Sequence, residues 1–203
     1  MPVFFICFIV FILWFRVKCK QADKATNAEN ELFWEREREA DFTPKKDISC
    51  LRYIQIDEAA LPFDEGDDAC EVEIQQKLRE LISKKMINLS GISNTELKLE
   101  YGRANLDELT EYDQNYNQLI SLLNQWGCVL FEKGDYKRAE TVLNYALSIG
   151  SDISGTFITL AKVYNALNEP EKIPSLIEKA DATNSLLKKS TIAHLREVLG
   201  EYR

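Results

Sequence analysis

The chain contains few residues whose types and spacing could support catalysis. Its single histidine, His194, lies between Ala193 and Leu195 in a segment with helical spacing, and no nucleophile motif accompanies it. None of the eight glycines forms a phosphate-binding loop before a Lys-Ser or Lys-Thr pair. Neither Gly-x-Ser-x-Gly nor His-Glu-x-x-His occurs. We therefore expect no catalytic residue, no enzymatic activity and no cofactor.

Residue types that bind metals are present without the spacing that a metal site requires. The segment from Asp57 to Glu73 is rich in acidic residues, but the stretch Asp64–Asp68 lacks the alternate ligands and the distal glutamate of an EF-hand loop. A solvated loop before a helix N-terminus explains this acidity more simply. The five cysteines contain no Cys-x-x-Cys pair and match no zinc site or disulfide framework. We expect reduced thiols and no metal.

The N-terminal segment is apolar as far as Phe15 and is followed by Arg16, Lys18 and Lys20. Fifteen helical residues rise about 22 Å, short of the ~30 Å hydrocarbon core of a bilayer, but the stems of the basic side chains can extend the span. A buried core segment is one alternative, and a cleaved signal peptide is another, although the latter places positive charge before its apolar stretch. We predict a transmembrane anchor over residues 1–18 that contacts the lipid bilayer. The positive-inside rule then predicts a single-pass cell-membrane protein, with the N-terminus outside and the C-terminal domain cytoplasmic.

Charge is distributed unevenly along the chain. The net charge of −8 is the sum of +3 for residues 1–21, which contain no acidic residue, and −11 for the remainder. An acidic body argues against nucleic acid as a partner, because phosphate binding needs a basic surface. Alternating charges over residues 19–45 predict a charged juxtamembrane spacer helix, followed by a cytoplasmic domain over residues 46–203.

The first part of that domain combines an extended segment with short helices. Residues 51–56, rich in β-formers, continue into Leu61-Pro62-Phe63 and predict an extended segment packed on the helical body. Its expected anchors are Ile54, Ile56, Leu61 and Phe63. Helical spacing of apolar residues predicts a helix over about 69–88, and the Ser93–Glu96 capping box predicts a short helix. Asp113 is expected to cap a longer helix.

From residue 120 onward the residue classes recur after 34 positions. Trp126-Gly127, Gly134 and Ala146 correspond to Leu160-Ala161, Asn168 and Ala180. A helix–turn–helix period of 34 residues resembles the tetratricopeptide repeat. The resemblance implies units at 120–153 and 154–187 and a capping helix at 186–202. The predicted fold is all-α: antiparallel helix pairs stacked as a short solenoid, with one N-terminal transmembrane helix and the extended segment packed on the helices.

The resemblance implies function by binding. Repeats of this family hold a peptide in a groove lined by the first helix of each unit. The corresponding positions in this chain are Ser121, Asn124, Gln125, Cys128, Glu132, Ile158, Lys162 and Asn165. The layout, carried by residues 33–38 and 94–113, is also similar to uncharacterised membrane-anchored helical proteins of anaerobic Gram-positive bacteria.

We therefore predict a membrane-anchored, cytoplasmic scaffold or adaptor that binds a protein or peptide and has no catalytic activity. The alternative is a structural or regulatory membrane protein that self-associates as a homo-oligomer. In that alternative the repeats only complete the core.

Overall fold

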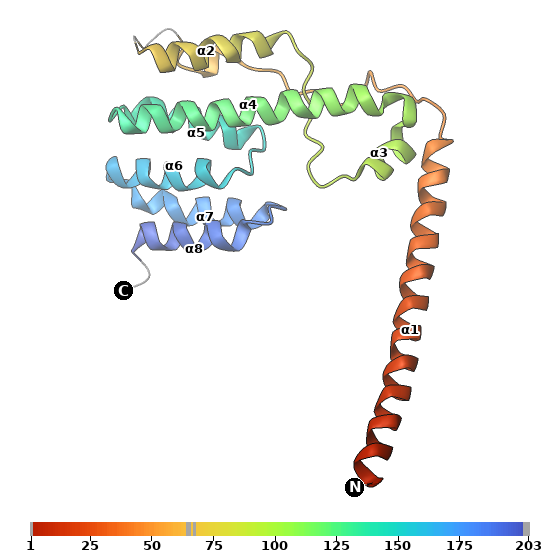
Figure 1. The fold of residues 1–203 in the computed structure, drawn as a ribbon. Coiled ribbons are helices and arrows are strands. Elements are labelled where there is room, and N and C mark those ends of the chain that lie inside the picture. Colours follow the sequence, from red (N-terminus) through yellow and green to blue (C-terminus); the bar gives the residue numbers. More distant parts are fainter. Residues whose placement is uncertain (1, 64–65, 67, 201–203) are drawn as a thin grey trace. The chain divides into compact units, whose positions relative to one another are not determined.

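The computed structural model describes residues 2–63, 66 and 68–200, and for residues 2–6, 22–26 and 28 it describes the backbone alone. The described residues form α-helices and short 3₁₀ helices with no strand, which confirms the all-helical prediction (Figure 1). The chain divides into two compact units. Unit 1 contains Met1–Ser49 and Ile92–Leu106, and unit 2 contains Cys50–Gly91 and Asp107–Arg203.

Unit 1 is built from a long helix and a short one. Helix α1 spans Pro2–Asp41, helix α3 spans Asn94–Tyr101, and the 3₁₀ helix η2 spans Arg103–Asn105. Ser93 and Glu96 form the expected capping box at the start of α3. Lys98 of α3 binds Glu37 and Asp41 of α1, each across 2.9 Å, so charged side chains tie the two helices together.

Residues 42–49 follow α1 and return along α3. The backbone N–H of Lys46 donates to the carbonyl oxygen of Tyr101 across 3.0 Å. The side-chain amide of Asn105 donates to the carbonyl oxygens of both Lys46 and Tyr101, each across 2.7 Å. Gly102 lies against this segment with φ +89°, and a Cβ atom there would lie 2.3 Å from the carbonyl oxygen of Pro44. The return of the chain therefore requires glycine at position 102.

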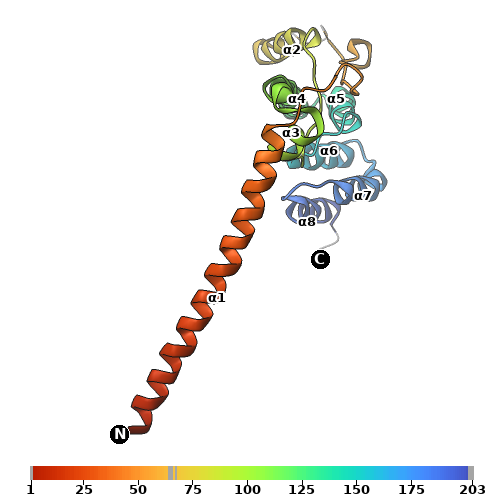
Figure 2. The same ribbon diagram turned by 90° about the vertical axis from the view of Figure 1, so that its right-hand side faces the viewer.

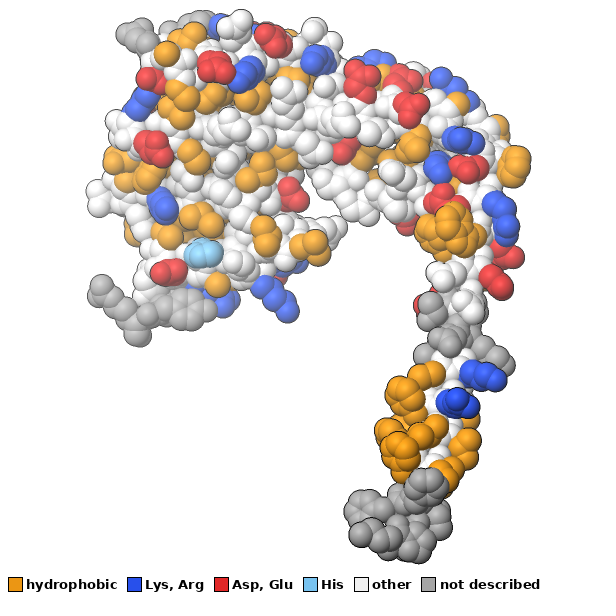
Figure 3. Space-filling model, in the orientation of Figure 1, with side chains coloured by type: hydrophobic (Ala, Val, Ile, Leu, Met, Phe, Trp, Pro, Cys, Tyr) orange, Lys and Arg blue, Asp and Glu red, His pale blue; other side chains and the backbone are white. Residues whose placement is uncertain are grey.

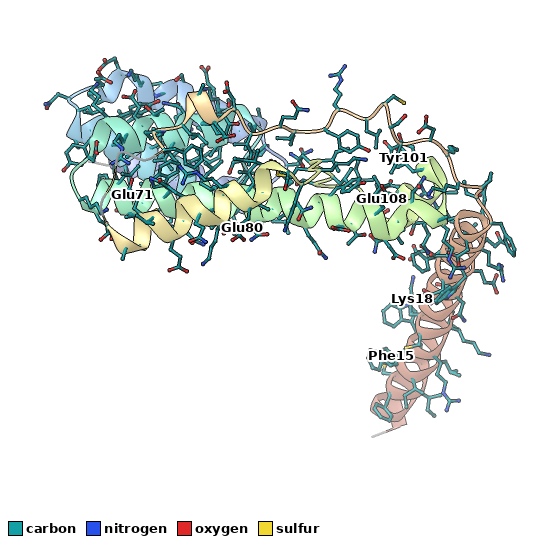
Figure 4. All side chains as sticks on the ribbon, turned by 90° about the horizontal axis from the view of Figure 1, so that it is seen from above. Phe15, Lys18, Glu71, Glu80, Tyr101 and Glu108 are labelled. Carbon is teal, nitrogen blue, oxygen red and sulfur yellow. The ribbon has the colours of Figure 1, made fainter. Side chains whose placement is uncertain are left out.

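The predicted transmembrane anchor is wrong. Among the residues that the structure describes, no helix combines the length and the apolar character that crossing a membrane requires. The physical reason is the short apolar run, which gives way to Arg16, Lys18 and Lys20 within the same continuous helix α1 (Figure 4). The predicted location as a single-pass cell-membrane protein, on which the outside N-terminus and the cytoplasmic C-terminal domain depended, is therefore also contradicted.

Unit 2 contains the other six long helices of the described chain. They are α2 (Ala69–Ile82), α4 (Leu106–Glu132), α5 (Tyr136–Ser148), α6 (Ser154–Ala166), α7 (Ile173–Ala182) and α8 (Lys188–Leu199). The 3₁₀ helix η1 (Glu58–Ala60) precedes α2, and η3 (Pro170–Lys172) precedes α7. Helices α5 to α8 run back and forth, with α7 and α8 side by side (Figures 1 and 2). The predicted capping helix extends to residue 202, and its end lies outside the described residues.

Helix α4 is continuous through Asp113, where a helix start was expected. The Asp113 carboxylate instead accepts a hydrogen bond from the backbone N–H of Leu89 across 3.0 Å. The capping-type residue therefore serves a neighbouring loop rather than its own helix, because an Asp side chain can bind any N–H group within reach.

The 34-residue period has a direct structural counterpart. Gly134 follows α4 and Asn168 follows α6, and both adopt left-handed backbone conformations, with φ of +80° and +59°. In each turn the next backbone N–H donates to the carbonyl five residues earlier. These bonds join Asp135 to Leu130 across 2.9 Å and Glu169 to Tyr164 across 2.8 Å. The same turn geometry therefore recurs 34 residues apart, and it also ends α5, where Gly150 has φ +91° and the Ser151 N–H donates to the Ala146 carbonyl across 3.0 Å.

The core of unit 2 lies between these helices. Trp126 is fully buried, and a Cβ atom at Gly127 would lie 2.3 Å from Leu143, so α4 and α5 pack at close range. Ala161, which corresponds to Gly127 in the period, is also fully buried. Lys172 joins the two helix pairs, because its ammonium contacts Glu140 of α5 across 2.8 Å and Glu169 across 2.5 Å.

The segment over residues 51–63 packs on the core as an irregular extended chain. The N–H of Ile54 donates to the carbonyl oxygen of Met86 across 2.8 Å, and the Phe63 ring lies 5.4 Å from the Trp126 ring. Ile56 and Leu61 are buried. The four expected anchors therefore all contribute to the core of unit 2.

Candidate functional site

The eight residues of the expected peptide groove lie on helices α4 and α6 of unit 2. Two of them face the neighbouring helix rather than solvent. The Thr156 hydroxyl donates to Asn124 Oδ1 across 3.2 Å, and Cys128 Sγ lies 3.4 Å from Thr159 Oγ1 in a hydrogen bond. A Cβ atom at Gly155 would lie 2.9 Å from Asn124 Oδ1. Asn124 and Cys128 therefore fasten α4 to α6.

The other groove residues are divided between helix packing and open surface. Asn165 Nδ2 donates to the carbonyl oxygen of Val198 in the last turn of α8 across 2.8 Å. Gln125 donates to Ser121 one turn earlier on α4, and Ile158 is half-buried. Glu132 and Lys162 are exposed. A continuous peptide-binding groove on this surface stays a prediction, and three of its seven polar side chains already bond to a neighbouring helix.

A depression of about 1130 Å³ lies elsewhere on unit 2, at the C-terminal ends of α5 and α7. We call it the 88–186 pocket. Three segments line it: the loop before α3, the end of α5 with the turn into α6, and the end of α7 with the following loop. The lining residues are Asn88, Ser90, Gly91, Asn144, Leu147, Ser148, Gly150, Ser151, Asp152, Phe157, Lys179, Ala182, Thr183, Asn184, Ser185 and Leu186.

The inner wall of the pocket is held in place by hydrogen bonds around Tyr116. The Asn88 amide donates to the Tyr116 hydroxyl across 3.1 Å, and that hydroxyl contacts the carbonyl oxygen of Ile149 across 3.4 Å. Gly150 has φ +91° and approaches Asn88 so closely that a Cβ atom would lie 3.3 Å from its amide nitrogen. This wall is therefore rigid, and the Asn88 amide is used in a hydrogen bond within the fold rather than being open to a ligand.

Other polar groups of the lining remain free to bind a ligand. The Asn144 carbonyl oxygen accepts from the Tyr164 hydroxyl across 3.3 Å, and within the described part of the chain nothing binds its NH₂ group. The exposed Asn184 side chain likewise has no hydrogen bond to a described residue. An amide side chain presents a donor and an acceptor together, which matches the two groups of a peptide unit. Asn144 and Asn184 are thus suited to bind the neutral polar groups of a ligand.

Unit 2 also contains a buried ionic cluster, which consists of Glu71, Trp126, Lys133 and Arg138. The Glu71 side chain is 1% exposed and accepts hydrogen bonds from the Trp126 indole across 3.1 Å, from Lys133 across 2.9 Å and from the Arg138 guanidinium. Burial by itself raises the pKa of Glu71, but the bonds from Lys133 and Trp126 and the charge of Arg138 outweigh it, so the pKa lies below its usual value.

The role of the ionic cluster is structural. Glu71 belongs to the first turn of α2 (Figure 4), Trp126 to α4 and Arg138 to α5, so one carboxylate joins three helices. The sequence contained only a weak signal for it, a glutamate within an acidic stretch, since its partners lie more than 50 residues away.

Residues with catalytic or metal-binding chemistry are not gathered in the described part of the chain. His194 is exposed on α8, where it is the single pale blue side chain of Figure 3. Among the described residues, no three or more His, Cys, Asp or Glu side chains come together as a metal site. The rejected calcium loop at Asp64–Asp68 lies largely outside the described residues. The five cysteines are free thiols.

Comparisons with known proteins identify no relative. No family model matches the chain, and we found no significant similarity to a characterised protein or to a solved structure. The resemblance to tetratricopeptide repeats therefore rests on the 34-residue period and the repeated turn geometry alone.

Proposed function

We propose that unit 2 is a non-catalytic module that binds an extended peptide segment of a partner protein, and that the 88–186 pocket holds this segment. The observation that carries the proposal is the lining of the pocket by neutral amide and hydroxyl groups, of which Asn144 and Asn184 retain free donors. A peptide backbone offers complementary groups at every residue and needs no charge to be recognised.

The apolar part of the lining fits the same class of ligand. Leu186 at the rim of the pocket is fully exposed, and Leu187 next to it is 60% exposed. Exposed apolar side chains beside convergent polar groups are typical of binding sites, because a ligand that covers them gains hydrophobic contact. The volume of about 1130 Å³ exceeds the usual upper range of ~1,000 Å³ for small-molecule sites and accommodates several residues.

Selection from a peptide library tests this proposal. The full chain is immobilised, a phage-displayed library of random dodecamers is selected on it, and enriched peptides are synthesised for affinity measurement. Loss of two neutral hydrogen bonds in the double variant Asn144→Ala/Asn184→Ala is expected to weaken binding about ten-fold. Gln125→Ala on the expected α4–α6 groove is the matched control and should change affinity less than two-fold. Failure to enrich peptides above a bare surface, or equal binding by the double variant, overturns the proposal.

A second candidate function, self-association through α1, is favoured by one observation. Between Phe8 and Val17 the apolar side chains of α1 are 38–59% exposed, and they form the orange stretch of α1 in Figure 3. With about 150–250 Å² per aromatic side chain and little more than half of each exposed, the four aromatic residues alone present on the order of 450 Å², over half of what one partner contributes to a standard interface. The part up to Phe15 contains no charged residue, so a second copy of it can cover it without charge repulsion.

Sedimentation equilibrium of the full chain tests this second candidate. We expect an oligomer that dissociates in the variant Phe11→Glu/Phe15→Glu, because two charges in an apolar interface are costly to bury. Glu35→Gln farther along α1 is the control and should leave the mass unchanged. A monomeric wild-type chain contradicts self-association and leaves the peptide-binding proposal intact.

A further inference from the structure

The two charged residues that line the 88–186 pocket come from different segments of unit 2. Lys179 belongs to the last turn of α7, and Asp152 belongs to the turn between α5 and α6. The carbonyl groups at a helix C-terminus carry about half a negative charge, which a cation in the last turn compensates. Both helices end at the pocket, so the presence or absence of a basic residue at each helix end decides which ligand charge the pocket prefers.

The α7 side is already compensated by lysines of the chain itself. Lys179 lies in its last turn, and the ammonium of Lys188 donates to the carbonyl oxygen of Asp181 and lies 3.8 Å from the Asp181 carboxylate. An ammonium group therefore lies against the C-terminal carbonyls of α7. The negative C-terminal end of α7 is therefore already paired with basic residues of the chain itself.

At the α5 side, backbone N–H groups cap the last carbonyls, as Ser151 does for Ala146 across 3.0 Å, but no basic residue compensates the negative end of the helix. The last turn of α5 contains no basic residue, and the Asp152 carboxylate adds a full negative charge four residues after the helix ends. No basic side chain of the described residues forms a salt bridge to Asp152. Burial raises the pKa of Tyr116, and the charges of Asp152 and Asp113 raise it further, so the negative field reaches the inner wall of the pocket.

The net charge of unit 2 adds to the negative potential at the pocket. Its 23 acidic and 15 basic residues give a net charge of −8, whereas unit 1 contains 10 of each and is neutral. The whole net charge of the chain therefore belongs to the unit that holds the pocket. A net negative domain raises the local concentration of cationic ligands and speeds their association.

We infer that the peptide bound in the 88–186 pocket is recognised by a cationic group, the side chain of a lysine or arginine, that lies against Asp152 and the carbonyl end of α5. This inference rests on the proposed peptide binding and adds the chemistry of the recognised residue. The ammonium or guanidinium group supplies the positive charge that the end of α5 lacks, while Lys179 in the last turn of α7 disfavours a second cation.

Capped peptide libraries with one fixed residue test the inference. Three libraries of the form acetyl-X5-Z-X5-amide, with Z as lysine, glutamine or glutamate and X without charged residues, are bound to the full chain at low salt. We expect about ten-fold stronger binding of the lysine library than of the glutamine library, and the weakest binding for glutamate. A glutamine library with a free N-terminus separates recognition of an α-ammonium from recognition of a side chain.

Two charge-matched variants show where the preference arises. Asp152→Asn should remove most of the preference for lysine, whereas Glu132→Gln, which changes the same charge on α4, should retain it. If all three capped libraries bind equally well, the inference is overturned and the proposed function stands. If none of the libraries binds, both fail. Equal loss of the preference in the two variants assigns it to the net charge of unit 2 and overturns the role of Asp152.

Discussion

The ionic cluster around Glu71 predicts a large loss of stability from a nearly isosteric substitution. Glu71→Gln retains the size of the side chain and an acceptor for the Trp126 indole, but removes the charge that Lys133 and Arg138 share. Removal of one partner of a buried ion pair costs about 3–5 kcal/mol. Because the Lys133 side chain is 35% exposed and can regain water, we expect the lower end, about 3 kcal/mol of unfolding free energy.

The assay follows the unfolding of unit 2 through its own tryptophan. In the background Trp14→Phe/Trp34→Phe, Trp126 is the remaining tryptophan of the chain, and its fluorescence is measured against urea concentration. Glu80→Gln, an exposed position on the same helix α2 (Figure 4), is the matched control and should change stability by less than about 0.5 kcal/mol. Equal midpoints for Glu71→Gln and Glu80→Gln refute the reasoning, since the cluster would then contribute nothing beyond a surface charge.

Three further predictions follow from the same structure. The pKa of Glu71 is lower in the folded chain than its ordinary value of 4.5, so its contribution to folding stability is complete above pH 4.5 and is lost as the pH falls below it. Urea midpoints measured from pH 7 to 3 should therefore fall less steeply in Glu71→Gln than in the wild-type chain. Parallel curves for the two chains contradict this prediction. Gly127→Ala forces a Cβ atom against Leu143 and should destabilise unit 2 by about 1–3 kcal/mol, whereas Gly134→Ala, with open space around it, should cost about 1 kcal/mol; thermal unfolding compares the two. In Gly102→Ala the new Cβ atom meets the carbonyl oxygen of Pro44, so hydrogen exchange of the Lys46 amide in unit 1 should become faster. Gly91→Ala, where nothing lies within reach of a Cβ atom, is the control and should leave that exchange unchanged. Unchanged exchange in both variants is evidence against a strained contact at Gly102.

Local features of the fold could be predicted where neighbours in sequence decide them. The Ser93–Glu96 capping box begins α3, and Gly134 and Asn168 end helices in the same left-handed turn, because these residue types act on their own backbone. Asp113 shows the limit of this reasoning. Its side chain could cap a helix, but a loop N–H from Leu89 competes for it within a longer helix.

The transmembrane prediction failed for a different reason. The sequence is apolar only as far as Phe15, and the span would need the stems of Arg16, Lys18 and Lys20 to reach the bilayer surface. The structure continues the same helix into charged sequence, and the apolar part alone is too short. Length is the stricter criterion, since the bilayer thickness is fixed.

The 88–186 pocket and the ionic cluster could not be predicted because tertiary contacts create them. The lining of the pocket comes from three segments separated by more than 20 residues, and each alone is an ordinary polar turn. The expected groove had the opposite difficulty. Repeat positions on α4 and α6 define its residues, but in the fold Asn124 bonds to Thr156 of α6 and Asn165 bonds to Val198 of α8.

The most direct test of the central claim is hydrogen exchange of the full chain with and without a selected peptide. Peptide binding in the 88–186 pocket predicts slower exchange in three segments, residues 88–91, 147–152 and 183–186, with little change on the α4–α6 surface around Gln125 and Lys162. Slower exchange confined to that α4–α6 surface, or no change in any of the three segments at saturating peptide, contradicts the account.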